Sequence, residues 1–464
     1  MSEGSGILEK LDPHLLALAR ELGRLFDAEG GQLSMVGGSV RDLFLGSGPD
    51  ELDLEVRGLP LEKVMAIVQR KYSCDEVGKA FGVLRIHGKP VEIALPRKEC
   101  KSGTGHKGFE VEIEPFLPFE LASARRDFTI NAMGLNPISG ELMDPFNGMR
   151  DLQKHILRHV GPAFIEDPLR VLRGMQFVAR FDLTAAPETI ILCQSMEMEG
   201  LPAERLYEEW KKLILRGKNI TAGLNFLKDA GWLKYFEELK ALVGCKQEPE
   251  WHPEGDVWIH TLHCMDAFAR ERTGEKWEDL VVGFAVLCHD FGKPATTYLA
   301  EDGRIRSPLH EPRGEEPTRS FLSRLTNQVD LHEEVVPLVR RHLTPRVFFK
   351  DQAGDGAIRR LARKVKRIDR LVRVAAADIS GRPPRKDDFP EGPWLLKRAK
   401  ELKVSDSEPE PIILGRHLID RGMNPSPKFG PILEECFEAQ LDGKFIELKD
   451  GLDFLSQILR KENS

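Results

Sequence analysis

The sequence predicts an α+β fold: a head that mixes helices and strands, then an all-helical neck and body, a second helical domain and a helical tail. Strand-like segments end before Asp151, and the apolar residues beyond it recur at helical spacing. The length of 464 residues suits about three domains. Breaks in the pattern divide the chain into four expected regions, 1–155, 156–247, 248–395 and 396–464.

The composition excludes several classes of protein. Lys and Arg total 67 against 74 Asp and Glu, which gives a net charge of −7 and excludes a globally basic nucleic-acid coat. The 7 cysteines form no CxxC pair, which argues against a disulfide framework or a cysteine-built zinc site. No stretch approaches the about 20 apolar residues of a membrane span, and the N-terminus lacks a signal-peptide pattern. We expect a cytoplasmic protein with no membrane partner.

The expected elements of the head come in a definite order. Apolar spacing predicts a helix over 8–26 and a short buried strand over 32–36. Residues 52–56 have strand character, and 83–87 and 91–95 are typical of a hairpin. Beyond the head, helices are expected over three segments, 164–181, 204–216 and 221–243.

A glycine pair, Gly37-Gly38, lies between the first strand and the next expected helix. Glycines at a helix N-terminus let backbone N–H groups approach a triphosphate, and Arg41, one turn later, can add a phosphate contact. The pattern indicates a site for a nucleoside triphosphate.

Acidic residues alternate along the following strand, at Glu51, Asp53 and Glu55, and therefore share one face of it. Carboxylates on one face can hold Mg²⁺ against a triphosphate, because hard cations prefer oxygen ligands. Glu51 and Asp53 are the expected catalytic metal ligands. Glu55 is an alternative partner for Asp53, and Glu92 on the hairpin is a candidate third acid.

This order of motifs resembles the head of the polymerase-β-like nucleotidyltransferases, specifically the bacterial class II CCA-adding enzyme and poly(A) polymerase family. The family pattern is GGxVRD followed by DxD, and Glu51 replaces its first Asp with a longer acid. Segments 124–133, 143–152 and 166–181 match later family motifs in the same order. The resemblance implies Mg²⁺-dependent addition of CCA to the 3′ end of tRNA from CTP and ATP, without a template and without an obligate protein partner.

The resemblance also assigns roles to residues that follow the head. Arg126, Asp127 and Asn131, expected on one helical turn, would bind the ribose and phosphate of a ribonucleotide. Residues 97–113 match the family's flexible loop, which favours a chain able to add A. Residues 203–210 match its last motif, in which Glu204, Arg205 and Glu208 are expected to brace helices.

Base selection is expected from Asp167 and Arg170, at i and i+3 on one helix face. A carboxylate beside a guanidinium complements the amino group and ring nitrogen of both cytosine and adenine, whereas uracil and guanine would leave polar groups unpaired. Glu166 would support the pair, and Arg173 would reach phosphate or base. Gln176 replaces a family Arg and leaves an A-adding enzyme or poly(A) polymerase open as an alternative.

Beyond a Pro/Trp/Gly-containing break at 248–256, ligand-type residues occur in the order H…HD…D: His260, His289, Asp290 and Asp378. They resemble the HD metal-dependent phosphohydrolase superfamily, and Lys293 follows as in its HDxGK variant. Imidazole and carboxylate donors suit a divalent metal, here of open identity, and a water there could attack a phosphoester. His310 and His342 are candidate additional ligands. The alternative is a non-catalytic HD scaffold that binds RNA.

A basic segment follows, with eight Lys and Arg over 359–373 against one acid. Its apolar spacing predicts one amphipathic helix with a basic outer face, which could follow an RNA backbone. An equally good interpretation is a solvated face whose charges balance acids elsewhere. Residues 413–445 are expected to form a helical tail of open role.

Overall fold

A computed structural model describes residues 3–49, 51–77, 82–101, 109–382 and 388–462. Intramolecular contacts divide the chain into two compact units. Unit 1 comprises Met1–Leu213 and Ala222–Tyr235, and unit 2 comprises Ile214–Thr221 and Phe236–Ser464. The finer division into four regions remains a prediction. No helix in the described part of the chain has the length and apolar character needed to cross a membrane.

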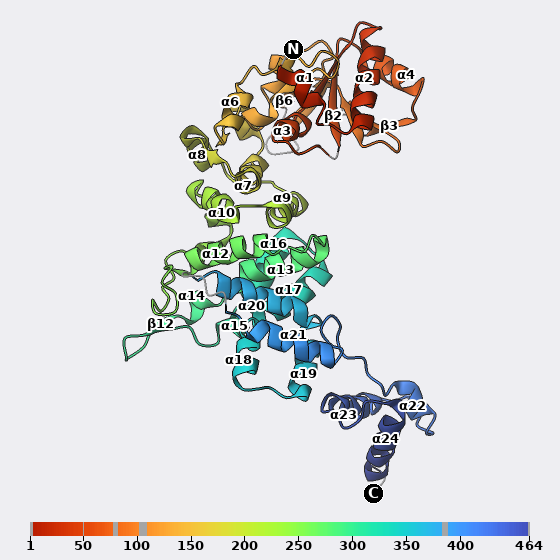
Figure 1. Ribbon diagram of the computed structural model, residues 1–464, viewed down its shortest axis with the longest axis vertical. Coiled ribbons are helices and arrows are strands. Elements are labelled where there is room, and N and C mark those ends of the chain that lie inside the picture. Colours follow the sequence, from red (N-terminus) through yellow and green to blue (C-terminus); the bar gives the residue numbers. More distant parts are fainter. Residues whose placement is uncertain (1–2, 50, 78–81, 102–108, 383–387, 463–464) are drawn as a thin grey trace. The chain divides into compact units, whose positions relative to one another are not determined.

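Unit 1 is built on a mixed seven-stranded sheet with the order β3-β4-β5-β2-β1-β8-β9 (Figure 1). Its strands are β1 (Gln32–Val36), β2 (Leu52–Arg57), β3 (Cys74–Val77), β4 (Val83–Ile86), β5 (Val91–Ala94), β8 (Gly134–Leu135) and β9 (Leu142–Met143). β2 runs antiparallel to β1 and parallel to β5. The expected strands and the β4–β5 hairpin are confirmed. Strands β3, β8 and β9 were not predicted, and the last two have only two residues each, too few for an alternating pattern.

The helix predicted over 8–26 corresponds to α2 (Pro13–Asp27), which begins later than expected. A short helix that was not predicted, α1 (Glu3–Leu8), precedes Asp12. The Asp12 carboxylate accepts hydrogen bonds from the backbone N–H groups of His14 and Leu15, which caps α2, and Pro13 fits the first helical position. α2 buries Leu22 and Phe26 and packs against β1 and α4 (Leu61–Gln69).

The segment expected to be a flexible loop is, in its described part, a two-stranded antiparallel ribbon. β6 (Arg97–Lys101) pairs with β7 (Phe109–Ile113), and residues 102–108 lie outside the described residues. Short strands also occur beyond Asp151, where none was expected. They are β10 (Ile156–Leu157) with β11 (Thr184–Ala185), and β12 (Tyr298–Leu299) with β13 (Ile305–Arg306).

Helices follow in the order expected. They are α3 (Gly38–Phe44), α5 (Phe119–Ser123), α6 (Gly148–Gln153), α7 (Leu169–Phe181), α8 (Pro187–Gln194), α9 (Ala203–Arg216), α10 (Ile220–Asp229) and α11 (Glu237–Leu242). The helix predicted over 221–243 is interrupted at Gly231, whose φ of 72° favours glycine. α7 packs its apolar face around Phe128, which makes edge-on contacts with Phe164 and Phe177.

Unit 2 is helical around one central helix, α13 (Lys276–Cys288). Every residue of α13 from Asp279 to Cys288 is buried, and a helix that is apolar nearly all round belongs in a core. It contacts three neighbours, α12 (Val257–Arg270), α17 (Val329–Arg341) and α20 (Ile368–Ser380) (Figure 1). The remaining helices are α14 (Lys293–Thr296), α15 (His310–Arg313), α16 (Glu315–Leu325), α18 (Thr344–Lys350), α19 (Asp355–Val365), α21 (Glu391–Glu401), α22 (Gly415–Ile419), α23 (Phe429–Leu441) and α24 (Leu448–Glu462).

The basic segment does not form the single helix that its spacing predicted. α19 and α20 are separated at Lys366, where φ is 60°. Arg360 and Arg363 bind acids of α23, while Arg370 binds Glu278 and Glu334. These charges therefore join elements of unit 2 to one another instead of forming the solvated face of the second interpretation. The tail α22–α24 encloses its own small apolar core, which includes Leu418, Ile432, Cys436 and Leu455.

Candidate active site and metal centre

The glycine turn of the head lies directly against the acid-bearing strand. Gly37 precedes α3 with φ 66° and ψ −132°, a backbone conformation that suits glycine. A Cβ atom at Gly37 would lie 2.9 Å from Nη1 of Arg126 and 3.6 Å from Oδ2 of Asp53. The structure thus brings together three predicted site residues that are far apart in the sequence.

Ser39 fixes this arrangement, although the sequence analysis did not single it out. Its buried hydroxyl donates to the Glu51 carbonyl at 3.0 Å and accepts from the Asp53 backbone N–H at 2.9 Å. The start of α3 is therefore tied to the start of β2. The sequence feature that could have predicted this role is the position of Ser39 directly after Gly37-Gly38, where a small hydroxyl side chain can reach the neighbouring backbone.

The acids on β2 differ in exposure. Glu51 and Asp53 reach solvent, whereas Glu55 is only 6% exposed and faces Arg126 at 3.7 Å. Nearby protein atoms desolvate the Asp53 carboxyl and raise its pKa, and the charges of Glu92 and Glu51 add to this effect while Arg126 opposes it. The strand register sets Glu92 beside Asp53. Carboxylates at the ends of β2 and β5 thus form a set of oxygen donors suited to Mg²⁺.

Glu55 and Glu92, the two alternative acidic partners of Asp53, differ in their exposure to solvent. Burial raises the pKa of Glu55, and its Oε1 has no hydrogen-bond partner among the described residues. Glu92 forms a cross-strand ion pair with Arg85. Of the two, Glu92 lies on the solvent side next to Asp53, while Glu55 lies inside the unit.

Arg41 is not placed as a free phosphate ligand. Its guanidinium donates to Oδ1 of Asn131 at 2.6 Å and to Asp42 at 2.8 Å, and the residue is only 5% exposed. It also lies over the rings of Phe177 and Phe181, at 5.1 and 4.4 Å from the ring centres. The prediction of a direct triphosphate contact does not match this geometry, because the cation is already paired inside unit 1.

Arg126, Asp127 and Asn131 are brought together, but not on one helical turn. Only Asn131 lies in the short 3₁₀ helix η1 (Thr129–Asn131), and Phe128 before it is extended. Asp127 Oδ1 accepts from Asn131 Nδ2 at 2.9 Å, and Arg126 Nη1 donates to the Asn131 carbonyl at 3.4 Å. Side-chain hydrogen bonds, rather than helical spacing, hold the group together.

The expected base-reading pair is arranged differently from the prediction. Asp167 lies before α7 rather than on its face, and its Oδ1 accepts from the Leu169 backbone N–H at 3.1 Å. Its Oδ2 accepts from Arg205 at 2.9 Å. Arg170 donates to the carbonyls of Ala163 and Arg125, at 2.7 and 2.6 Å. Asp167 has an extended backbone, as the residue before a proline favours, and α7 begins only after Pro168, so Asp167 lies off the helix face.

Other residues near this pair also have internal partners. Glu166 forms an ion pair with Arg125. Gln176 is 1% exposed within α7 and accepts from Arg180 at 3.0 Å. The substitution of Gln for the family Arg thus lies in the packed interior of unit 1.

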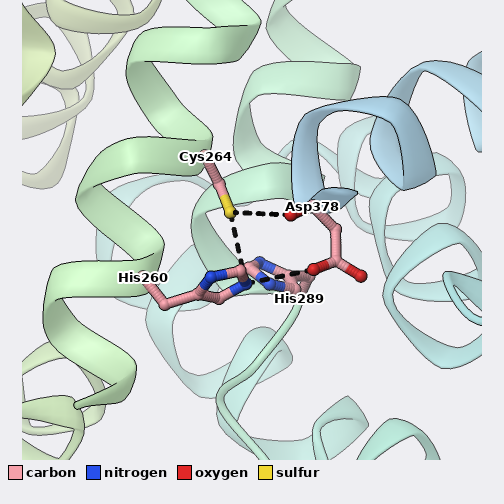
Figure 2. A group of neighbouring side chains, drawn as sticks. All are labelled: His260, Cys264, His289 and Asp378. Atoms are coloured by element: carbon pink, nitrogen blue, oxygen red, sulfur yellow. Dashed lines mark hydrogen bonds and ion pairs between the residues drawn. The ribbon is translucent and has the colours of Figure 1, made fainter. Parts of the chain in front are cut away.

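The HD residues converge in unit 2 from separate helices. His260 lies on α12, His289 and Asp290 directly follow α13, and Asp378 lies on α20. All four are buried, and Figure 2 shows His260, His289 and Asp378 side by side. His260 Nε2 lies 3.0 Å from Asp378 Oδ1 and 3.9 Å from Asp290 Oδ2. The sequence prediction of this cluster matches the structure.

Cys264 joins the cluster and was not predicted. Its Sγ lies 3.3 Å from His260 Nε2, because the two residues are one turn apart on α12 (Figure 2). The spacing of four residues from His260 was the signal that could have found it.

Charge in the HD cluster is strongly coupled. Burial alone disfavours an imidazolium, yet the adjacent Asp290 raises the pKa of His289 to about 10. Burial would favour a neutral Asp290, but His289 and Lys293 hold its pKa well below the ordinary value. Burial lowers the pKa of His342 to about 3, and the charges of His289 and His310 add to this. The cluster therefore contains an ionised carboxylate and a neutral imidazole side by side.

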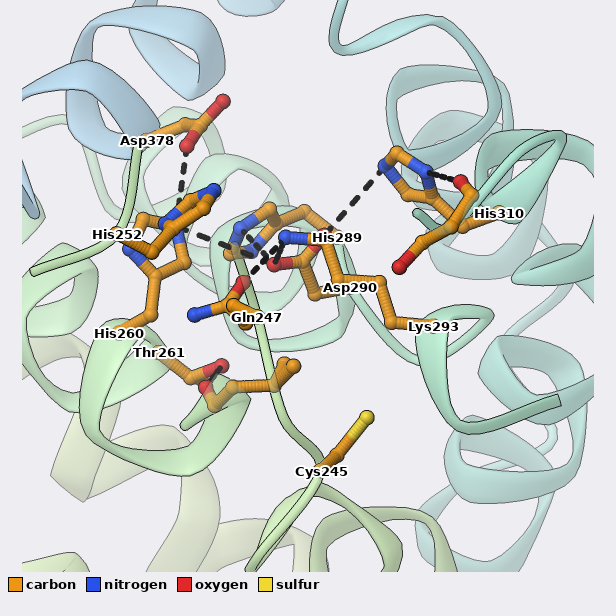
Figure 3. Close-up of polar contacts among 12 residues, drawn as sticks. Cys245, Gln247, His252, His260, Thr261, His289, Asp290, Lys293, His310 and Asp378 are labelled. Carbon is orange, nitrogen blue, oxygen red and sulfur yellow. Dashed lines mark hydrogen bonds and ion pairs between the residues drawn. The ribbon is translucent and has the colours of Figure 1, made fainter. Parts of the chain in front are cut away.

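A cavity of ≈ 380 Å³ opens onto this cluster. Cationic side chains line it at Lys293, Arg346 and Arg382 (Figure 3 shows Lys293). Trp251, 45% exposed, lies at its edge beneath Arg346, whose guanidinium is 6.0 Å from the ring centre. Lys293 and Arg382 form ion pairs with Asp290 and Asp378 at this cavity, and a lining that combines cations with histidines and acids suits a phosphate ester.

Comparisons with known proteins identify relatives that match most of the chain. Residues 33–158 match the family described as the poly A polymerase head domain. The chain is 37% identical to a multifunctional CCA protein of Xanthomonas campestris pv. campestris over 381 residues, 79% of this chain and 89% of the relative. It is also 37% identical to a multifunctional CCA protein of Stenotrophomonas maltophilia over 390 residues, 81% of this chain and 92% of the relative.

Solved structures share the fold. A CCA-adding enzyme of Bacillus stearothermophilus in complex with CTP superposes with a TM-score of 0.67 at 22% identity, covering 98% of this chain and 99% of the other. A Thermotoga maritima CCA-adding enzyme complexed with tRNA superposes with a TM-score of 0.60 at 22% identity, and the match covers 98% of both chains.

Fold and head site together define a nucleotidyltransferase with a poly(A) polymerase type of head on a helical body. The extent and identity of the sequence matches place the chain more narrowly. It belongs to the family of multifunctional CCA proteins, and the family and fold class predicted from the sequence are confirmed.

Proposed function

We propose that this protein adds CCA to the 3′ ends of tRNA, taking CTP and ATP as substrates and using no template. The observation that carries the proposal is the approach of Gly37, Asp53 and Arg126 to one another at the junction of β1, α3 and β2. A glycine turn there leaves room for a triphosphate beside carboxylates and a cation. The names of the relatives support the reaction.

In this proposal Glu51 and Asp53 hold Mg²⁺, with Glu92 beside Asp53. The donor set fits the ion because it consists of carboxylates that reach solvent at one edge of the sheet. When bound, Mg²⁺ neutralises phosphate charge as the tRNA 3′-hydroxyl attacks the α-phosphate and pyrophosphate leaves. Gly37 and Gly38 let the backbone approach the triphosphate, and Arg126 supplies positive charge next to it. Arg41 acts indirectly, since its hydrogen bond orients Asn131.

Base selection is proposed to rest on Asp167 and Arg170, with Arg205 holding the carboxylate in place. Arg173 supports the ribose-binding group through Asp127. The burial of Gln176 gives no reason for CTP and ATP to be handled differently, so the A-adding and poly(A) alternatives gain no support from it.

The test is incorporation of labelled CTP and ATP with Mg²⁺ into tRNAs that end before the first C, after the second C and after the final A. Addition of CCA followed by a stop supports the proposal, whereas A alone or long A runs would favour an alternative. Asp53→Asn should abolish incorporation. The matched control Asp27→Asn, at the exposed end of α2, should leave it unchanged. Incorporation retained by Asp53→Asn would remove Asp53 from the catalytic group, whereas no incorporation by the wild type into any of the three tRNAs would favour the non-catalytic scaffold.

We also propose that the HD centre binds a divalent metal and hydrolyses a phosphoester. One buried atom supports a missing cation: Oδ1 of Asp290 has no hydrogen-bond partner in the described part of the chain, whereas Oδ2 forms ion pairs with Lys293 and His289. His260, His289, Asp290 and Asp378 would hold the ion, which would supply an activated water. Arg346, which lines the cavity, would bind the phosphate, while Lys293 and Arg382 form ion pairs with Asp290 and Asp378. Asp290→Asn should abolish metal-dependent hydrolysis of p-nitrophenyl phosphate while nucleotide addition by the head persists.

A further inference from the structure

Charged residues alternate along β2, where Asp53, Glu55 and Arg57 share one face of the strand. Asp53 reaches solvent and belongs to the proposed Mg²⁺ site, whereas Glu55 is only 6% exposed. A carboxylate buried to this extent is costly unless a cation lies close to it. The cation that partners Glu55 therefore bears on what this acid does.

That cation is Arg126, from the segment before η1. Its Nη2 lies 3.7 Å from Oε2 of Glu55. Burial raises the pKa of Glu55, and the charges of Arg126 and Arg57 oppose this effect. Arg57 is also held by other groups, because its guanidinium donates to the Ser34 hydroxyl at 3.0 Å and lies 5.0 Å from the centre of the Phe119 ring.

The two ends of the Arg126 guanidinium face different surroundings. Nη2 faces the buried Glu55, whereas Nη1 lies only 2.9 Å from the position that a Cβ atom at Gly37 would take. The Arg126 side chain is 26% exposed, so it extends from the interior of unit 1 to the glycine turn. One guanidinium thus connects Glu55 with the place where a triphosphate is proposed to bind.

Arg126 needs such an anchor. An arginine side chain is long and has many rotamers, so an unrestrained guanidinium would leave the glycine turn readily. Its hydrogen bond from Nη1 to the Asn131 carbonyl is long, at 3.4 Å, and restrains it weakly. The ion pair with Glu55 adds a second restraint from the opposite end of the guanidinium.

Glu55 is well placed to supply this restraint. It lies on a central strand whose backbone pairs with β1 on one side and β5 on the other, where its partners are Ser34 and Ala94. Its Oε1 accepts no hydrogen bond from the described residues, so its charge is not spent on other donors there. A rigid backbone and an uncommitted carboxylate together make an effective anchor for a flexible cation.

We propose that Glu55 is a positioning residue, whose buried carboxylate holds the guanidinium of Arg126 beside Gly37 to meet the phosphates of the incoming nucleotide. The inference rests on the proposed nucleotide addition by the head and identifies the residue that orients its phosphate-binding cation. Glu55 itself touches neither the nucleotide nor the metal.

The first measurement is the steady-state kinetics of CTP addition by the full chain to a tRNA that ends before the first C. Glu55→Gln keeps the size of the side chain and removes its charge. The KM for CTP should rise about tenfold, the order that contacts between charged groups contribute. The KM for tRNA and kcat should change far less, because a contact made equally in the ground and transition states affects KM. Glu62→Gln, at an exposed position on α4, is the matched control and should keep the wild-type constants.

A double-mutant cycle with Arg126→Ala separates positioning from a general structural role. If Glu55 acts through Arg126, Glu55→Gln has no further effect on CTP once Arg126 has been replaced. The Kd for CTP, measured by calorimetry, gives the same comparison for variants with little turnover, and circular dichroism shows that each variant is folded. If Glu55→Gln does not fold, Glu55→Asp, which sets the carboxylate back by one methylene, enters the same cycle.

The outcomes separate this inference from the proposal on which it rests. A wild-type KM for CTP in Glu55→Gln, or effects of the two substitutions that multiply in the double variant, would overturn the positioning role and leave nucleotide addition in place. No incorporation by the wild type would overturn nucleotide addition instead. The calorimetric cycle would then decide the positioning role, since a Kd for CTP that Glu55→Gln raises only when Arg126 is present supports it and any other result overturns it.

Discussion

Arg173 donates from Nε to Oδ2 of Asp127 at 2.7 Å, so a cation of α7 holds a carboxylate from the segment before η1. The other oxygen of Asp127 accepts from the backbone N–H of Phe128 at 2.8 Å and from Asn131 at 2.9 Å. Asn131 in turn accepts from Arg41 of α3 at 2.6 Å. One chain of polar contacts therefore links the glycine-turn helix to the helix that follows Asp167.

Arg173→Ala should destabilise the protein, because it leaves the nearly buried Asp127 carboxylate without its cation. Hydrogen bonds to charged groups contribute about 1.5–3 kcal/mol, and we expect a loss in that range from the free energy of unfolding of unit 1. Urea denaturation followed by circular dichroism measures it. Arg150→Ala, at an exposed position on α6, is the matched control and should change little. Equal unfolding midpoints for the two variants would contradict the assigned role.

The same pair predicts a dependence of stability on pH. Burial alone would raise the pKa of Asp127, but Arg173 and the hydrogen bond from Asn131 outweigh it and lower the pKa below the ordinary 3.8. A carboxyl group whose pKa is lower in the folded state stabilises the protein at pH values above its unfolded-state pKa. This stabilisation is lost as the pH falls through the folded-state pKa. The stability difference between wild type and Asp127→Asn should be constant from pH 7 to about pH 5 and shrink below about pH 4. A difference that grows with acidity would exclude this linkage.

Gly37→Ala should impair nucleotide addition. The new Cβ would crowd Arg126 Nη1 at 2.9 Å, and the backbone conformation strains any other residue. Strain of about 1–3 kcal/mol corresponds to a loss of roughly 5- to 150-fold in kcat/KM if it falls on the transition state. The matched control is Gly46→Ala, which has the positive φ of 78° but nothing within 4 Å of its Cβ. It should lose stability and keep most of its activity, so an equal loss of activity in both variants would show that strain alone is responsible.

Patterns with a short period predicted most of the head. The alternation of Glu51, Asp53 and Glu55 identified one strand face, and the H…HD…D order identified residues that do converge in unit 2. The first succeeds because a strand fixes where side chains at alternate positions point. The second depends on the resemblance to a known family, because its residues come from three separate helices. The sequence did not reveal that Glu55 would be buried beside Arg126, since burial depends on how the sheet is covered.

The sequence could not predict which acidic residue each arginine pairs with. Arg360 and Arg363 bind acids more than 70 residues later, on α23, rather than facing solvent. Asp167 accepts a hydrogen bond from Arg205, while Arg170 donates to the carbonyls of Ala163 and Arg125, and Asp167 precedes the start of α7. A guanidinium can pair with any nearby carboxylate, so its partner is decided by tertiary packing.

Base discrimination offers the most direct test of the rearranged pair. Arg205 donates a hydrogen bond to Oδ2 of Asp167 at 2.9 Å. Arg205→Ala should remove this restraint on the orientation of the carboxylate without removing the carboxylate itself. We expect the ratio of kcat/KM for CTP over UTP to fall at least tenfold in Asp167→Ala, because loss of one base-edge partner removes about 1.4 kcal/mol or more. Arg205→Ala should show a smaller fall. Lys211→Ala on the same helix, whose partner is the exposed Glu208, is the control and should keep the wild-type ratio. If Asp167→Ala lost the wild-type ratio and Arg205→Ala kept it, Arg205 would only brace the helices. If Asp167→Ala kept the wild-type ratio, Asp167 would have no part in base selection.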